Sequence, residues 1–218
     1  LIATSMFGVT TPCVERVRKN VENAGYEVLV FHATGNGGQS MEALINDGFI
    51  EAVADVSTTE WNDELVGGVM SAGPNRLDAA AQMGIPQVVS CGALDMVNFG
   101  VMETVPKKFS DRTFYEHNAN VTLMRTTPEE CAEVGEVLAN KLNKATGPTV
   151  LFIPLKGVSA IDEEGQPFYF PKADAALFDA IRTHLNQDKV KLIELDLHIN
   201  DTEFADAMTL ELLEMIKK

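Results

Sequence analysis

Six short apolar segments alternate along the chain with longer stretches that have helical periodicity. The apolar segments are Leu1–Phe7, Tyr26–His32, Ile50–Val56, Pro86–Cys91, Thr149–Leu155 and Val190–Leu197. Several of them are continuous apolar runs rather than alternating ones, which is typical of strands that are covered on both faces. The pattern therefore predicts a parallel sheet with helices on either side.

The stretches between these segments carry helix start and stop signals. Thr11 and Pro12 form a start, and Gly25 is expected to end that helix in a left-handed conformation. The run Thr127-Pro128-Glu129-Glu130 is a capping box that opens a helix to Ala145. The other predicted helices are Gly38–Asp47, Pro74–Met83, Lys172–Asn186 and one that starts at Asn200–Glu203 and runs to the C-terminus. Six β-α repeats predict one Rossmann-like α/β domain over residues 1–218, doubly wound and mostly parallel, with about six strands.

Two connections are too long to be simple turns, namely Gly92–Thr126 and Lys156–Pro171. Each follows a predicted strand, so each begins at the C-terminal edge of the sheet. Loops longer than about 12–15 residues in a compact domain are usually functional or disordered. The first connection contains Phe99, Phe109 and Tyr115 and is too aromatic for a disordered linker, so we expect it to cover a site.

The composition narrows the classes of partner. The chain of 218 residues is 45% hydrophobic and 22% charged, as in ordinary globular proteins, and its net charge is 17 − 32 = −15. This acidity disfavours binding to nucleic acid and to anionic lipid, since both depend on Lys and Arg. No apolar run approaches the roughly 20 residues of a membrane-spanning helix.

The first residues and the cysteines suggest where the protein works. Leu1–Phe7 has no basic flank, so it is not expected to be a signal peptide, and it resembles a strand cut at its start. The three cysteines, Cys13, Cys91 and Cys131, are odd in number and form no C-x-x-C pair. They suit a reducing compartment, and we expect a cytoplasmic protein with no metal site and a possible homo-oligomeric state.

The sharpest chemical feature is the run from His32 to Ser40, HATGNGGQS, which joins a predicted strand to a helix. Its three glycines let the backbone turn tightly and approach a ligand closely. The helix that follows presents free N–H groups, which favour phosphate or carboxylate. The spacing is neither G-x-G-x-x-G nor a P-loop, and a tight strand-to-helix turn remains the alternative.

Polar residues follow the other predicted strands as well, and parallel strands bring such residues to one edge of the sheet. Arg76 could clamp a carboxylate or phosphate, although an ordinary surface arginine is the alternative, and Lys156 beside Gly157 is a plausible partner for an anion. The candidate ligand-binding residues are Thr10, Gly35, Asn36, Gly37, Gly38, Gln39, Ser57, Thr58, Arg76, Lys156 and Ser159.

Catalytic candidates are weaker. Lys156 or Asp95 could exchange protons with a substrate, and His32 and His117 could meet in the cleft to assist them. No base is paired with a nucleophile in the sequence, and Cys91 suits a small buried side chain better than a nucleophile. Whether the chain is an enzyme stays open at this point.

Four stretches give the chain a family resemblance. They are Phe31–Glu42, Ala72–Ala80, Val121–Thr127 and Phe152–Asp162, and they span almost the whole chain in order. The chain resembles the tomato mosaic virus resistance protein-like family, also called Tm-one-like. The glycine loop departs from the family pattern, which more often has Thr at position 36 and Arg near position 39; this chain has Asn36 and Gln39.

The resemblance implies several properties. Members have two α/β domains and roughly twice this length, so this chain would be the C-terminal half and the N-terminal domain would be its partner. The family implies ATP binding, with the named ATP-binding region in the N-terminal half. The plant member acts by binding a viral replication protein.

Three hypotheses follow. The first is an α/β domain that binds a small anion or a nucleotide phosphate at the strand C-termini, near an interdomain cleft. The second is half of a metabolic enzyme acting on a phosphorylated or carboxylated metabolite. The third is a protein-interaction module without a ligand, which predicts a flat strand-end face and an exposed apolar patch.

Overall fold

A six-stranded parallel sheet forms the centre of the molecule in the computed structural model, which describes residues 1–217. The strand order is β2-β1-β3-β4-β8-β9. These strands are β1 (Ile2–Met6), β2 (Val28–His32), β3 (Ala52–Ser57), β4 (Gln87–Gly92), β8 (Thr149–Pro154) and β9 (Lys191–Leu195). All six predicted strands are present within two residues of their predicted bounds, and the predicted Rossmann-like α/β class is confirmed.

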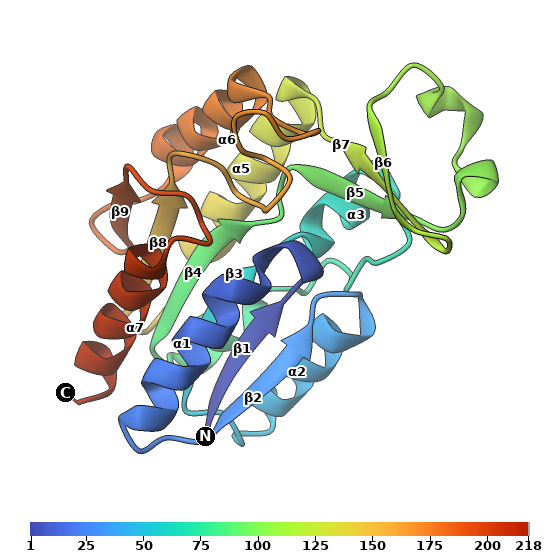
Figure 1. Cartoon of the computed structure of the whole chain (residues 1–218). Coiled ribbons are helices and arrows are strands. Elements are labelled where there is room, and N and C mark those ends of the chain that lie inside the picture. The colour runs from blue at the N-terminus through green and yellow to red at the C-terminus, as the bar shows by residue number, and fades with distance from the viewer. Residues whose placement is uncertain (218) are drawn as a thin grey trace.

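Helices cover both faces of this sheet (Figure 1). The helices α1 (Thr11–Asn23) and α7 (Thr202–Ile216) pack side by side on one face. The opposite face is covered by α2 (Asn36–Asn46), α3 (Glu60–Val66), α4 (Asp78–Met83), α5 (Pro128–Leu142) and α6 (Pro171–His184). The central strands β3, β4 and β8 are buried at every residue, whereas the edge strands β2 and β9 are partly exposed. The continuous apolar run of β8 therefore marks a strand that is covered on both faces, whereas the similar run of β2 lies at an edge of the sheet.

Two of the predicted helix start and stop signals are found at the observed ends of helices. The Thr127 hydroxyl accepts a hydrogen bond from the Glu130 N–H at 3.2 Å, and the Glu130 carboxylate accepts one from the Thr127 N–H at 2.9 Å. This is the predicted capping box at the start of α5. Gly25 follows the end of α1 with a φ of +93°, as expected for a left-handed terminal residue.

Three features differ from the sequence prediction. The helix expected over Pro74–Met83 begins only at Asp78, because Leu77 adopts a left-handed φ of +72° and the residues before it form a turn. The short helix α3 was not predicted. The long connection after Gly92 contains an antiparallel sheet of β5 (Met96–Phe99), β6 (Phe114–Asn118) and β7 (Val121–Arg125), together with two 3-10 helices.

The small sheet leaves the large one at the carboxyl ends of its strands (Figure 1). Asp63 of α3 anchors it, because its carboxylate accepts hydrogen bonds from the Asn98 backbone N–H at 2.9 Å and from the Asn98 side-chain amide at 2.6 Å. The three cysteines are buried and form no disulfide. Within residues 1–217, no helix is both long and apolar enough to cross a membrane.

Candidate functional site

The glycine loop between β2 and α2 already holds an anion, and that anion belongs to the chain itself. The Glu60 carboxylate accepts hydrogen bonds from the N–H groups of Gly35 at 2.8 Å and Gly38 at 3.1 Å. Glu60 is the first residue of α3 and is only 1% exposed. The backbone groups that were expected to bind a ligand anion are therefore engaged by an internal carboxylate.

The close approach of Glu60 explains why this loop needs its glycines. A Cβ atom on Gly38 would lie 2.2 Å from a Glu60 carboxylate oxygen, and one on Gly37 would lie 1.7 Å from the His32 carbonyl oxygen. Gly35 has a φ of +89°, in the region that favours glycine. Tight packing thus accounts for the three glycines in this structure.

Arg76 lies at the centre of a buried ionic network around this loop. Its guanidinium donates two hydrogen bonds to Asp55, at 2.5 and 2.7 Å, and one to Glu60 at 2.7 Å, and it contacts Glu42 at 3.3 Å. Burial alone would lower the pKa of Arg76, but the three carboxylates raise it well above its ordinary value. The side chain is 1% exposed, so in this conformation the predicted ligand clamp binds the carboxylates of the chain instead.

Most other predicted side chains at the strand ends are buried and bonded to each other. Thr10 and Ser57 share a hydrogen bond of 2.6 Å between their hydroxyls, and the Thr58 hydroxyl donates to the Ser90 carbonyl at 3.0 Å. The Ser159 hydroxyl donates to Asp95 at 2.7 Å. These contacts place the polar side chains inside the protein.

The remaining candidates at this edge are accessible. Asn36, Gln39 and His32 are exposed around the glycine loop. His117 is exposed on β6, and its ring lies 3.8 Å from where a Cβ of Gly8 would stand. The small sheet therefore brings His117 to the end of β1, while His32 stands at the end of the neighbouring strand β2.

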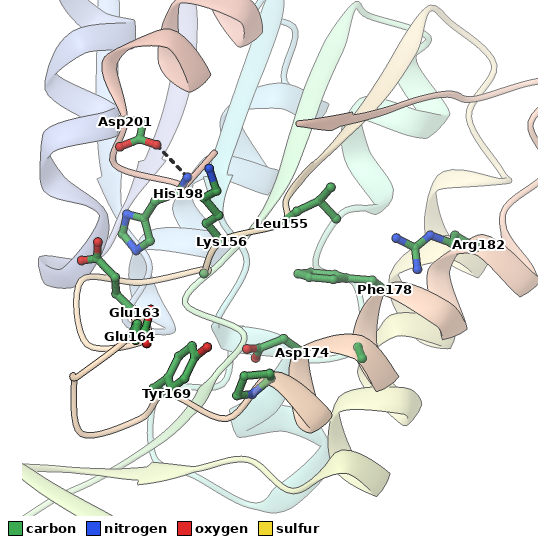
Figure 2. Close-up of a pocket in the computed structure, with 13 residues that line it drawn as sticks. Leu155, Lys156, Glu163, Glu164, Tyr169, Asp174, Phe178, Arg182, His198 and Asp201 are labelled. Atoms are coloured by element: carbon green, nitrogen blue, oxygen red, sulfur yellow. Dashed lines mark hydrogen bonds between the residues drawn. The ribbon is translucent and has the colours of Figure 1, made fainter. Parts of the chain in front are cut away.

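A cavity of about 500 Å³ opens at the carboxyl ends of β8 and β9, beside α6 (Figure 2). Its polar wall combines the segment after β8, the segment after β9 and the first turn of α6. It is lined by Leu155, Lys156, Gly157, Glu163, Glu164, Tyr169, Pro171, Asp174, Ala175, Phe178, Arg182, His198 and Asp201. This cavity occupies the edge of the sheet where the sequence predicts a site, and it includes the predicted Lys156.

Asp174 joins the cavity to a buried group of charges. Its carboxylate accepts a hydrogen bond from the Arg125 guanidinium, which also contacts Asp162 at 3.3 Å. Burial raises the pKa of Asp174 to about 7, and the neighbouring Asp162 adds to that rise while Arg125 opposes it. Behind them, burial raises the pKa of Asp95 to about 8, with Asp162 contributing. Asp174 is therefore a carboxyl at the cavity wall that exchanges its proton near neutral pH.

His198 has a fixed orientation at the other side of the cavity. Its Nε2 lies 2.8 Å from the Ser159 carbonyl oxygen, and its Nδ1 accepts the Asn200 N–H at 3.2 Å. This pattern selects the tautomer with the proton on Nε2. The Asp201 carboxylate accepts the backbone N–H of His198 at 2.8 Å (Figure 2), which holds the whole turn in place.

The two long cationic side chains of the cavity, Arg182 and Lys156, differ in how firmly other residues hold them. Arg182 donates hydrogen bonds to Glu194 and to Asp179, each at 2.6 Å. Lys156 has one ion pair, with Asp196 at 3.1 Å, and the two side chains are 55% and 82% exposed. Exposed pairs contribute only about 0–1 kcal/mol, so Lys156 can exchange its partner at small cost.

Sequence reasoning found Lys156 but missed Asp174, Tyr169 and His198. A signal for Asp174 was present, because it stands in the first turn of a helix that starts at Pro171, directly after the long connection. No local sequence signal singles out His198, because it has no second histidine at metal-ligand spacing. Within residues 1–217, no group of three or more His, Cys, Asp or Glu side chains is arranged to hold a metal ion.

Comparison with known proteins places the chain in a family. The model of the uncharacterised protein family UPF0261, C-terminal domain, matches residues 1–216. A UPF0261 protein of Clostridium tetani is 59% identical over all 218 residues, which make up 54% of its length. A UPF0261 protein of Rhizobium meliloti is 51% identical over 94% of this chain and 52% of its own.

A plant relative extends the family beyond bacteria. The ToMV resistance protein Tm-1(GCR237) of Solanum lycopersicum is 47% identical over the whole chain, which covers 29% of the tomato protein. The chain spans about half the length of the bacterial relatives. The resemblance noted in the sequence is confirmed, and the chain belongs to the UPF0261 family as a C-terminal domain of that family.

Proposed function

We propose that this domain binds a small metabolite in the cavity between α6 and the ends of β8 and β9, with an anionic group of the metabolite beside Lys156. The observation that carries the proposal is the cavity itself. Its volume of about 500 Å³ lies within the range of small-molecule sites, and it stands outside the carboxyl ends of parallel strands. An interaction module without a ligand would have a flat strand-end face, and the cavity at this edge disfavours that alternative.

Lys156 supports the anionic part of the proposal. Its ion pair with Asp196 is exposed and weak, so a ligand carboxylate or phosphate can replace Asp196. The family model describes a C-terminal domain, and the relatives are longer than this chain. We propose that the domain preceding it in the whole protein borders the opening of the cavity. Ligand sites at domain interfaces are common.

ATP, which the resemblance implies for the whole protein, fits this cavity poorly. A triphosphate carries several negative charges, whereas the lining sets Lys156 against the carboxyl groups of Glu163, Glu164, Asp174 and Asp201. The proposal therefore concerns a ligand with a single anionic group.

The test is a titration of the 218-residue chain with butanoate and with inorganic phosphate, followed by backbone amide NMR. We expect shifts in the segments after β8 and at the start of α6, and a loss of binding in Lys156→Met. The matched control is Lys191→Met, because Lys191 is 56% exposed and makes a comparable surface pair with Glu211 at 2.6 Å. Absence of shifts with both anions, or equal weakening by both variants, would contradict the proposal.

One observation favours a second function, half of an enzyme. Asp174 lines the cavity, and its pKa of about 7 suits general acid–base work. Asp95, the acid that the sequence suggested, is 1% exposed and lies behind Ser159, so it does not reach the cavity. Turnover of a bound metabolite that is lost in Asp174→Asn with binding retained would support this function.

A further inference from the structure

We infer that the metabolite bound in this cavity carries a hydroxyl group besides its anionic group, and that Tyr169 and Asp174 recognise this hydroxyl, which makes the ligand a hydroxy acid. The inference rests on the proposed function, since it assumes that the cavity binds a small anion beside Lys156. It follows from two polar groups of the cavity wall that face each other without being bonded.

Tyr169 and Asp174 present their polar groups to the same part of the cavity. Tyr169 belongs to the segment that leads into α6, and Asp174 stands in the first turn of that helix. In Figure 2 the Tyr169 hydroxyl and the Asp174 carboxyl point toward each other, and these two described residues share no hydrogen bond. A ligand atom that enters between them can therefore contact both.

The surroundings of Asp174 indicate that this ligand atom need not carry a charge. Asp174 is 9% exposed, and its carboxylate accepts a hydrogen bond from the Arg125 guanidinium, with Asp162 beside them. Arg125 thus already supplies a positive charge next to Asp174. Tyr169 is 47% exposed, and its hydroxyl has no hydrogen-bond partner among the residues drawn in Figure 2.

A ligand that fills the cavity removes water from both polar groups. A buried polar group without a partner costs more free energy than an ordinary hydrogen bond contributes, so the ligand has to supply a partner for each of them. A hydroxyl both donates and accepts. Because Asp174 exchanges its proton near neutral pH, a ligand hydroxyl can donate to its ionised form and accept from its protonated form. A ketone oxygen only accepts, and an ammonium group only donates.

The wall between these groups and Lys156 suits the carbon chain of such an acid. In Figure 2, Leu155 and Phe178 lie between Lys156 and Asp174 along the wall. Leu155 is 39% exposed and offers apolar surface to a ligand. A carboxylate beside Lys156 and a hydroxyl beside Asp174 are then joined by a chain that packs against apolar side chains, as is usual in small-molecule sites.

The experiment compares acids of equal length that differ only in one oxygen. The 218-residue chain is titrated by calorimetry at neutral pH with pentanoate, with the hydroxypentanoates that carry the hydroxyl at each carbon from the second to the fifth, and with the corresponding oxopentanoates. We expect one hydroxypentanoate to bind about ten-fold more tightly than pentanoate and than its own oxo acid, since one or two well-placed hydrogen bonds have about that effect.

Variants assign the preference for the hydroxyl to its two partners. Tyr169→Phe keeps the exposed ring, and it is expected to lower the affinity for the preferred hydroxy acid toward that for pentanoate while pentanoate binds as before. The matched control is Tyr26→Phe, because Tyr26 lies outside the cavity and packs against the core beside α1 and α7. Asp174→Ala should also remove the preference, whereas Asp174→Asn should keep part of it, because an amide both donates and accepts.

The outcomes separate the inference from the proposed function. If no hydroxypentanoate binds more tightly than pentanoate, and Lys156→Met weakens all of them, the function stands and the hydroxy acid is refuted. If a hydroxypentanoate is preferred but Tyr169→Phe leaves the preference unchanged, or if an oxo acid binds equally tightly, the recognition by Tyr169 and Asp174 is refuted. If no compound of the series binds, both the function and the inference are overturned.

Discussion

Replacing Glu60 by Gln tests whether the glycine loop is held by an internal anion. In the native chain the carboxylate accepts the Gly35 and Gly38 N–H groups and a hydrogen bond from Arg76 at 2.7 Å. Glutamine has nearly the same shape but no charge. Its amide NH₂ also cannot accept the hydrogen bond that Arg76 donates, because both groups are donors.

The expected loss of stability follows from these contacts. Breaking a buried ion pair by removing one partner costs about 3–5 kcal/mol. Two effects reduce the loss for Glu60→Gln. First, the amide oxygen still accepts hydrogen bonds from the N–H groups of the loop. Second, the neutral side chain does not bear the cost of burying a charge. In the native chain this burial raises the pKa of Glu60, although Arg76 opposes the rise. We therefore expect the free energy of unfolding to fall by about 3 kcal/mol, the low end of that range.

Urea unfolding at neutral pH measures this change. With a slope of about 2 kcal/mol per M, the midpoint should fall by about 1.5 M. Amide hydrogen exchange at Gly35 and Gly38 should accelerate together with it. The control is Glu22→Gln, in an exposed pair with Arg18 at 2.7 Å, which should change stability by less than about 0.5 kcal/mol. If Glu60→Gln changes the free energy of unfolding by less than about 1 kcal/mol, the internal carboxylate does not hold the loop, and the loop becomes a candidate ligand site again.

Three further changes test other parts of the structure. Gly37→Ala should destabilise the fold by more than about 3 kcal/mol in the same urea assay, because its Cβ would overlap the His32 carbonyl oxygen, and a wild-type value would refute this. Thr127→Ala removes the cap of α5 and should cost about 1 kcal/mol by thermal unfolding, and no change would show that the cap is dispensable. Burial raises the pKa of Asp95 to about 8, so its contribution to stability is fully present below its ordinary pKa near 4 and is lost as the pH rises through about 8. Asp95→Asn should therefore flatten the decline of unfolding free energy between about pH 4 and 8, and an unchanged pH profile would contradict the assigned shift.

The strands and most helices follow from the sequence because their signals are local. The apolar run of β8 and the capping box of α5 each involve neighbours along the chain, and both appear in the structure where they were expected. The predicted start of α4 at Pro74 was wrong, because contacts with residues far away in the sequence determine where this helix begins. Gly73-Pro74 is a signal for a turn as well as for a helix start. The buried contacts of Arg76 with Asp55 and Glu60, which lie 21 and 16 residues away, fix the segment as a turn.

The small antiparallel sheet was not predicted either, because its pairing strands are separated by a long stretch of sequence. Its strands β5 and β7 pair across the long connection, with Met96 opposite Arg125 and Phe99 opposite Thr122. The aromatic residues of this segment correctly indicated an ordered connection. They did not show that the segment folds as a sheet, because Phe99 and Phe109 pack against each other rather than along one regular strand.

Most of the residues that the sequence singles out lie at the ends of β1, β2 and β3, whereas the cavity opens at the ends of β8 and β9, and the buried charges account for this difference. The strand order reverses between β1 and β3, and ligands of doubly wound sheets commonly bind at such a reversal. Here that position is filled by Thr10, Ser57 and Glu60, which are all buried and bonded to each other or to the glycine loop. A glycine loop and a helix N-terminus can accept any anion, including one that the chain supplies from a helix 25 residues away. In this chain the internal carboxylate of Glu60 occupies the loop, and the open space lies at the ends of β8 and β9, where Lys156 is exposed and Asp174 lines the wall.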